Sequence, residues 1–227
     1  MKKIGKKIAQ YYLWCLAKFT LYRFRPSIIA VTGSTYRQVV KEEILKALEE
    51  KFRLRMSPKN YNAEIGVPMS ILGITIDKGS KLSWLKLLLF EAPKIAFGNK
   101  KFPEKLILEL AIDKPKDMDY LLTLIKPEVV AITNITNEYI DNFGSLDKIA
   151  KEYLKLIKQA PNNGLALLNY DDLRLKELSH VKPQAITYGL TNEAKFYPQE
   201  IEHLNSGQSF KLKINDKILS FQLNKFG

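Results

Sequence analysis

The chain has 227 residues, of which 46% are hydrophobic and 26% are charged, and its formal net charge is +12. This length and composition fit one globular core, and the lack of low-complexity tracts or long repeats excludes disordered and solenoid proteins. A single cysteine, Cys15, excludes an internal disulfide framework and a cysteine-rich zinc site. No apolar run approaches the roughly 20 residues that a membrane span needs.

The first 26 residues form a basic segment, because they hold seven of the net positive charges and no acidic residue. Apolar residues recur at helical spacing over residues 2–22 and predict an amphipathic helix that ends before Pro26. The predicted apolar face consists of Ile4, Ile8, Tyr11, Tyr12, Cys15 and Phe19. Basic residues follow this stretch at once, and no small-residue cleavage site appears, so we expect the helix to remain in the mature protein.

Three roles are open for this N-terminal helix. It can pack on the core, lie on a membrane surface through residues 2–22, or bind nucleic acid. Aromatic residues at helical spacing favour packing, whereas Trp14 and its neighbours beside lysines also suit a membrane interface. No nucleic acid is expected as a partner, because no recognised nucleic-acid-binding fold accompanies the charge.

The next part of the chain alternates strands with helices. Residues 27–32 (SIIAVT) read as a buried strand, and Val40, Ile44, Leu48 and Phe52 then recur at helical spacing. Strands are also predicted at 105–110, 129–133 and 165–169, with helices near 117–125 and 145–159. This alternation predicts an α/β fold with a mainly parallel, P-loop-type sheet.

After about residue 184 the pattern changes to period-two alternation joined by short polar turns, which predicts antiparallel strands. We expect this tail to pack on one side of the parallel sheet. The predicted organisation is therefore a basic helix at 1–26, a central α/β domain at 27–184 and an antiparallel β extension of that domain at 185–227.

The segment IIAVTGSTYRQVVKEEI lies between a strand and a helix N-terminus, where backbone amides can hold phosphate. With SPKNYNAEIGVPMSILG, LILELAIDKPKDMDYLLTLIKPEVVAITNI, DNFGSLDKIAKEYLKLI and LALLNYDD, it resembles the central domain of the Mur ligases. The resemblance covers roughly residues 27–225. It is closest to the members that add D-alanyl-D-alanine to a UDP-muramoyl tripeptide.

The resemblance implies ATP and magnesium as the family's cofactors, with an acyl phosphate that an amine attacks. Such chemistry depends on positioning and on neutralising charge. The matching nucleotide-binding positions are Gly33, Ser34, Thr35, Arg37, Gln38 and Asn134; Asn60 and Asn62 match substrate-side positions, and Glu109 matches a metal ligand.

Several of these positions depart from the family pattern TGS-x-GK-T/S. Tyr36 replaces a glycine that lets the backbone curl around phosphate. Arg37 keeps the charge of the lysine but has a planar, forked shape. Gln38 removes the hydroxyl that would bind Mg²⁺. The resemblance also implies a metal-binding histidine where Tyr139 stands and a carbamylated lysine where Tyr153 stands, and a phenol replaces neither.

Structural alternatives stay open for the retained residues. Glu109 reads as a vestigial metal ligand or as a polar residue at a strand end. Asn60 and Asn62 are equally compatible with a turn. Asp171 and Asp172 match the family's NxDD, but capping the next helix explains them at least as well.

The sequence therefore predicts a degenerate Mur-ligase-like protein that is catalytically inactive and acts in binding or scaffolding, with no cofactor assigned. The alternative is residual activity as an ATP-dependent acid–amino-acid ligase or a nucleotide hydrolase in cell-wall synthesis, with Arg37 in place of the lysine. The expected partner is an intact Mur ligase or another wall-synthesis protein. The expected location is the cytoplasm, at the inner face of the membrane if the helix is interfacial. The family's flanking N-terminal and C-terminal domains are expected to be absent.

Overall fold

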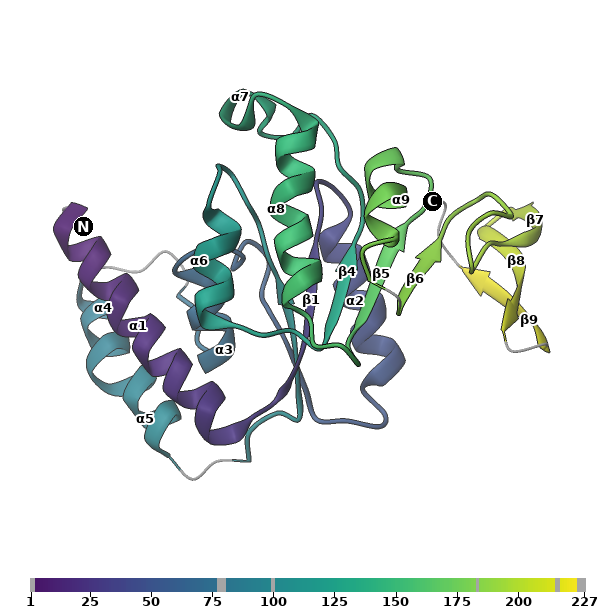
Figure 1. The fold of residues 1–227 in the computed structure, drawn as a ribbon. Helices are drawn as coiled ribbons and strands as arrows, with labels where there is room; N and C mark the ends of the chain where they lie inside the picture. The colour runs from purple at the N-terminus through teal and green to yellow at the C-terminus, as the bar shows by residue number, and fades with distance from the viewer. Residues whose placement is uncertain (1–2, 77–80, 99–100, 183, 215–216, 224–227) are drawn as a thin grey trace.

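The computed structural model describes residues 3–76, 81–98, 101–182, 184–214 and 217–223. Its centre is a six-stranded sheet with the order β2-β3-β1-β4-β5-β6, in which every pairing is parallel (Figure 1). The strands are β1 (Ser27–Thr32), β2 (Leu54–Met56), β3 (Lys105–Glu109), β4 (Val129–Ile132), β5 (Leu165–Asn169) and β6 (Ala185–Tyr188). The predicted parallel α/β fold is confirmed.

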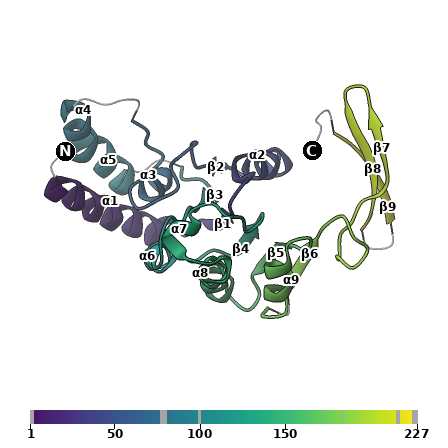
Figure 2. The same cartoon turned by 90° about the horizontal axis from the view of Figure 1, so that it is seen from above.

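Helices cover both faces of this sheet (Figures 1 and 2). They are α1 (Lys3–Phe24), α2 (Arg37–Leu48), α3 (Gly66–Leu72), α4 (Lys81–Lys86), the π-helix η1 (Leu87–Glu91), α5 (Ala92–Phe97), α6 (Asp117–Leu124), α7 (Ile140–Phe143), α8 (Leu146–Gln159) and α9 (Leu173–Ser179). Helix α2 lies on one face. The other helices that contact the core lie on the opposite face, which holds the larger cluster of buried side chains.

The central strand β1 shows why its sequence is almost continuously apolar. Ile28 and Ala30 belong to the larger core cluster, whereas Ile29 and Val31 point to the other face, toward α2. Successive side chains of a strand alternate between faces, and both faces are covered here. A strand buried on both sides needs apolar residues at every position.

Most predicted boundaries agree with the structure to within one residue. The strands at 27–32 and 165–169 have their predicted bounds, and those at 105–110 and 129–133 end one residue earlier. One residue was misplaced: Phe52 lies beyond α2, which ends at Leu48. The helical spacing of apolar residues continues to Phe52, but the helix ends four residues earlier, after just over three turns.

Helix α1 is present, but its buried face differs from the prediction. Leu13, Leu16 and Ala17 are buried against the core, whereas Ile8 and Tyr11 of the predicted face are 65% and 70% exposed. Where α1 lies close to α3 and α5, its fully buried side chains are small or aliphatic, while Tyr12 of the predicted face is partly buried and also packs against the core. Packing is therefore one role of the helix, through a face that the spacing of aromatic residues did not indicate. Residue 2 lies outside the described residues.

Within the described ranges, no helix combines the length and apolar character needed to cross a bilayer.

The C-terminal region contains a second sheet, and one prediction for this region is wrong. Strand β6 pairs in parallel with β5 and completes the central sheet, although residues 185–188 were expected to be antiparallel. The antiparallel part is the three-stranded sheet of β7 (Gln199–Leu204), β8 (Gly207–Ile214) and β9 (Lys217–Leu223). Figure 2 shows this sheet beyond the β6 edge, standing apart from both faces of the central sheet. Period-two alternation alone does not distinguish the two kinds of pairing.

Candidate functional site

The loop between β1 and α2 lies at the carboxyl end of the central strand and depends on two unusual backbone conformations. Gly33 has φ 124°, and a Cβ there would lie 2.0 Å from Thr133 Oγ1. Tyr36 has φ 62° and ψ 5° at the N-cap of α2, and its side chain is 72% exposed. The position of Tyr36 thus needs the left-handed backbone that glycine adopts at little cost.

Asn134, two residues beyond β4, ties this loop to the neighbouring strand. Its backbone oxygen accepts from Ser34 N at 2.9 Å, and its Oδ1 accepts from Thr35 N at 2.9 Å. Its Nδ2 donates to Thr35 Oγ1 at 2.6 Å. The amides of Ser34 and Thr35, which a phosphate-binding loop would aim at its ligand, therefore already have acceptors within the protein.

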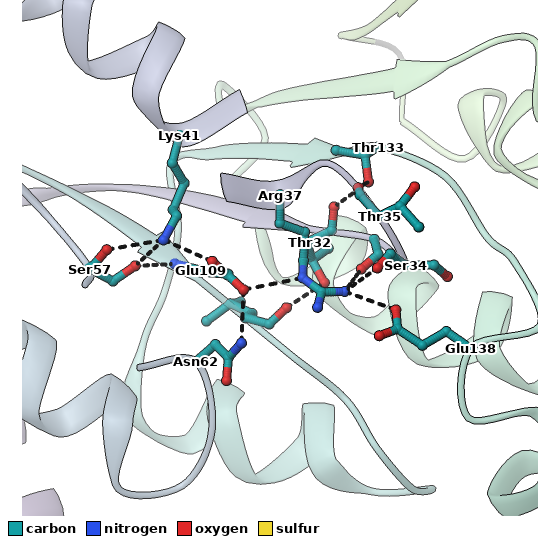
Figure 3. A network of polar contacts seen from close by, with 12 residues as sticks. Thr32, Ser34, Thr35, Arg37, Lys41, Ser57, Asn62, Glu109, Thr133 and Glu138 are labelled. Carbon is teal, nitrogen blue, oxygen red and sulfur yellow. Dashed lines mark hydrogen bonds and ion pairs between the residues drawn. The ribbon is translucent and has the colours of Figure 1, made fainter. Parts of the chain in front are cut away.

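The side chain of Arg37 folds back over the loop that precedes it (Figure 3). Its Nη1 donates to the carbonyl oxygen of Gly33 and, at 2.7 Å, to that of Ser34. The same nitrogen lies 3.3 Å from Glu138 Oε2, and Nε donates to Glu109 Oε1 at 3.2 Å. The guanidinium therefore links the loop to the end of β3 through Glu109 and to the segment that follows β4 through Glu138.

Glu109, the last residue of β3, is held by a second cation from α2. Lys41 Nζ lies 2.8 Å from Glu109 Oε2, and the lysine side chain is fully buried. Ser57 closes this part of the network, because Lys41 Nζ donates to Ser57 O and Oγ at 3.0 and 3.2 Å. Asn62 Nδ2 donates to Glu109 Oε1 at 2.8 Å. Both oxygens of the Glu109 carboxylate thus have protein donors.

The network balances its own charge. Burial raises the pKa of Glu109, but hydrogen bonds from Lys41 and Asn62 and the charges of Lys41 and Arg37 outweigh burial, so the pKa is lowered. For Arg37, burial lowers the pKa, and the charges of Glu138 and Glu109 more than compensate, so the pKa is raised. The carboxylate of Glu109 and the guanidinium of Arg37 therefore each favour the ionised form of the other.

The two tyrosines that stand at implied metal-ligand positions also lie at this site. Tyr153, on α8, is buried, and burial raises its pKa to about 12 against the opposing effects of a hydrogen bond with Thr32 and the charge of Arg37. Tyr139 has φ 60°, and its pKa is raised by burial and by the charges of Asp113 and Glu138. Both phenols therefore remain neutral at physiological pH.

The side chains present do not fit a magnesium site. Gln38 donates from Nε2 to Glu42 at 2.7 Å, which leaves its Oε1 buried without a partner. The Gln38 amide is a poor substitute for the hydroxyl that the resemblance implies there, and the Glu109 carboxylate is already held by two cations. Among the described residues there is no cluster of three or more histidine, cysteine or acidic side chains that could hold a metal.

The remaining candidate residues divide between this site and local structure. Asn62 contacts Glu109, as described, whereas Asn60 has φ 66° and thus the conformation of a turn residue. Asp172 caps α9 by accepting from Arg174 N and Leu175 N, and Asp171 accepts from Leu190 N. The capping interpretation therefore describes Asp172, and Asp171 holds a nearby loop.

Three residues of the network were not selected from the sequence, namely Lys41, Ser57 and Glu138. A signal existed for Lys41, because it lies three residues before Ile44 and four before Leu45, both of which pack on the core. A lysine on the inward face of a helix needs a buried partner. Ser57 follows a three-residue strand and Glu138 lies in a loop, and neither position carried a pattern.

Comparison with known proteins places this chain in a family. The family model described as the Mur ligase middle domain matches residues 88–227. The chain belongs to the Mur ligase family. The resemblance inferred from the sequence motifs is thereby confirmed for the middle domain, which in this family belongs to ATP-dependent ligases.

The similar proteins agree with this assignment. Over 205 residues the chain is 25% identical to the UDP-N-acetylmuramoyl-tripeptide–D-alanyl-D-alanine ligase of Haemophilus influenzae, covering 87% of this chain and 38% of the relative. The enzyme of the same name from Bacillus subtilis is 25% identical over 198 residues, covering 87% and 37%. The chain thus spans less than half the length of these relatives.

Solved structures show the same fold. A crystal structure of MurF from Acinetobacter baumannii superposes with a TM-score of 0.76 at 20% identity, covering 96% of this chain and 43% of that one. MurF ligase from Thermotoga maritima, in complex with ADP, superposes with a TM-score of 0.74 at 22% identity, covering 94% and 44%. At these identities the likeness concerns the fold.

Proposed function

We propose that this chain is a non-catalytic member of the Mur ligase family, which acts by binding other molecules of peptidoglycan-precursor synthesis. The observation that carries the proposal is the position of the Arg37 side chain, which bonds to the carbonyls of its own loop and to Glu109. Membership of the Mur ligase family supports a role in peptidoglycan-precursor synthesis. The binding partner that we propose is an intact Mur ligase.

Electrostatics gives the physical reason for the loss of nucleotide binding. Triphosphate binding at a helix N-terminus depends on amides and cations that are available to the ligand. In this chain the amides of Ser34 and Thr35 have internal acceptors, and the charge of Arg37 is balanced by Glu109 and Glu138. A nucleotide would have to break contacts that are partly buried before it gained any.

The lack of suitable metal ligands supports the loss of catalysis. Phosphoryl transfer needs cations that neutralise the reacting phosphate. Glu109 is the retained acidic residue at this position, and Lys41 and Arg37 already neutralise it. Tyr139 and Tyr153 stay protonated and offer no charged oxygen to a metal. We therefore expect neither acyl-phosphate formation nor hydrolysis of ATP.

The competing function is residual ligase or hydrolase activity with Arg37 in the role of the lysine. It is favoured by one observation, which is that Arg37 keeps a positive charge at the N-terminus of α2. An enzyme of this kind would have to release the guanidinium from Glu109 and Glu138 when ATP arrives.

Measurement of phosphate release tests the proposal. The purified chain is incubated with ATP and Mg²⁺, with and without a UDP-muramoyl tripeptide and D-alanyl-D-alanine, and inorganic phosphate is followed over time. We expect release no faster than in buffer. Release that requires the protein and is lost in the Arg37→Ala variant would support the competing function and overturn the proposal.

A further inference from the structure

The positive charge of this protein is concentrated in two segments that are far apart in the sequence. Residues 1–26 carry a net charge of +7, and residues 81–101 carry five lysines and one glutamate, a net charge of +4. Together they hold 11 of the 12 net charges. The remaining 180 residues, which include the whole candidate site, are nearly neutral.

The fold brings these two segments together. Helix α1 lies beside α5, with the rings of Phe19 and Phe97 5.0 Å apart and Arg23 Nη1 donating to Ala96 O at 3.0 Å. Figures 1 and 2 show α1, α4 and α5 as neighbours at the end of the molecule opposite the antiparallel sheet. The parts of the two basic segments that the structure describes therefore lie together at one end of the protein.

Helix α1 has a second apolar face that the core does not use. Residues 9, 13, 16, 17 and 20 are buried, whereas Ile8, Tyr11, Phe19 and Tyr22 are exposed, the last by 73%. The exposed residues are separated by intervals that place them on one side of a helix. This side carries large apolar groups where a solvated helix would carry polar ones.

The second segment repeats this feature. Leu82, Leu85, Leu89, Phe90 and Phe97 are exposed large apolar residues on α4, η1 and α5. The ring contact between Phe97 and Phe19 joins them to the exposed face of α1. The basic apolar surface is the name that we give to these nine residues together with the exposed lysines Lys7, Lys86 and Lys94 of the same two segments. The nine apolar residues are Ile8, Tyr11, Phe19, Tyr22, Leu82, Leu85, Leu89, Phe90 and Phe97.

We infer that the basic apolar surface adsorbs onto the surface of an anionic lipid bilayer. Lysine and arginine side chains are attracted by anionic headgroups, while exposed leucine, phenylalanine and tyrosine side chains enter the boundary between headgroups and acyl chains. Stable peripheral binding needs both contributions, and this side of the protein supplies both.

Charge and the exposed apolar side chains together favour an anionic bilayer over the other possible binding partners. A second copy of the chain would bring two strongly basic surfaces together, which disfavours association. Nucleic acid would attract the lysines but would leave Leu82, Leu85 and Leu89 exposed to water. An acidic protein surface is the remaining alternative, and the experiment separates it from a bilayer.

The test is co-sedimentation of the full chain with lipid vesicles. At low salt we expect binding to phosphatidylcholine vesicles that contain phosphatidylglycerol and no binding to phosphatidylcholine alone. The charge variant combines Lys7→Glu, Lys86→Glu and Lys94→Glu. Each basic residue near the surface raises the partition coefficient about fivefold, so we expect the partition coefficient of this variant to fall by on the order of a hundredfold. The apolar variant combines Tyr11→Ser, Leu82→Ser and Phe90→Ser, and we expect a loss of roughly tenfold or more.

A matched control reverses three exposed lysines elsewhere, Lys51→Glu, Lys151→Glu and Lys158→Glu. It makes the same change in net charge and should keep most of the binding. Circular dichroism and thermal unfolding verify that each variant folds. None of the substitutions touches the loop at Arg37, so the result is independent of the proposed function.

Four outcomes would overturn the inference. The wild type could fail to sediment with anionic vesicles at low salt, or the control could lose as much binding as the charge variant. The apolar variant could bind as the wild type does, which would leave only a charge effect. Finally, binding to soluble polyglutamate as tight as to anionic vesicles would assign the surface to an acidic protein.

Discussion

The guanidinium of Arg37 and the carboxylate of Glu109, 72 residues apart in the sequence, are joined by a hydrogen bond of 3.2 Å between Nε and Oε1. This contact places a protein cation beside the acidic residue that the sequence motifs predict at a metal-ligand position. Since Lys41 holds the other oxygen at 2.8 Å, the carboxylate is neutralised from within the fold. The site is a network of side chains at the carboxyl ends of four adjacent strands, β2, β3, β1 and β4.

Replacing Tyr36 by glycine should stabilise the protein. A tyrosine with φ 62° carries a steric cost of roughly 1–2 kcal/mol, and its exposed side chain makes little packing contribution. The greater flexibility of an unfolded glycine offsets about half of this, so we expect the free energy of unfolding to rise by roughly 0.5–1 kcal/mol in urea denaturation.

Tyr139 provides the matched comparison, because it has φ 60° but is less exposed and bonds to the side chain of Glu138. Tyr139→Gly should therefore gain less than Tyr36→Gly. A lower free energy of unfolding for Tyr36→Gly would show that the tyrosine makes a contact that compensates for its backbone.

Removing the carboxylate of Glu109 should destabilise the fold strongly. Glu109→Gln leaves the ammonium of Lys41 buried without its anion, and breaking a buried pair in this way costs about 3–5 kcal/mol. Adding Lys41→Met should recover part of the loss, because the double variant buries no uncompensated ammonium. Urea denaturation of the three variants gives the coupling free energy.

The exposed pair Lys46–Glu43, at 2.9 Å, is the control for the buried pair. Glu43→Gln should change the stability little, since exposed ion pairs are screened by solvent. If the effects of Glu109→Gln and Lys41→Met were simply additive, the buried pair would not act as a unit.

The raised pKa values of two buried tyrosines predict that the protein loses stability at alkaline pH. Burial raises the pKa of both Tyr153 and Tyr188 to about 12, whereas an unfolded tyrosine titrates near 10. Between these values the unfolded state has released its proton and the folded state has not. Each group therefore contributes stability that is present below pH 10 and falls by about 1.4 kcal/mol per pH unit as the pH rises toward 12.

Substitution separates the two contributions. Tyr153→Phe should remove about half of this alkaline dependence, and Tyr188→Phe, on β6, should remove a similar share. The measurement is the free energy of unfolding from urea titrations across the alkaline range. An unchanged slope in Tyr153→Phe would mean that its phenol is not buried as the structure has it.

The sequence was informative wherever a pattern reported local geometry. Buried strands such as 27–32 were visible because both faces of the sheet are covered, and the position of Asn134 next to the loop followed from parallel strands ending at one edge. The side chain of Arg37 could not be placed, because a pattern that shows a lysine position does not show whether its replacement turns toward a ligand or toward Glu109.

The exposed face of α1 was unpredictable for a related reason. A helix with apolar residues on two sides, such as Leu13 on one and Tyr11 on the other, gives no clear indication of which side is buried. The choice depends on the neighbours, here α3 and α5, and the pairing of α1 with residues 92–97 is a long-range contact. Local periodicity contains no information about it.

Calorimetric titration with ATP and Mg²⁺ tests the central claim most directly. The wild type is compared with a loop-restoring variant that combines Tyr36→Gly, Arg37→Lys and Gln38→Thr, with MurF ligase of Thermotoga maritima, whose structure contains ADP, as the positive control. If the network around Arg37 excludes nucleotide, the wild type will show no binding under conditions that saturate the control. The variant, with a compact ammonium and an unstrained loop, will gain nucleotide binding without measurable ligation. Micromolar, magnesium-dependent binding of ATP by the wild type would contradict the account.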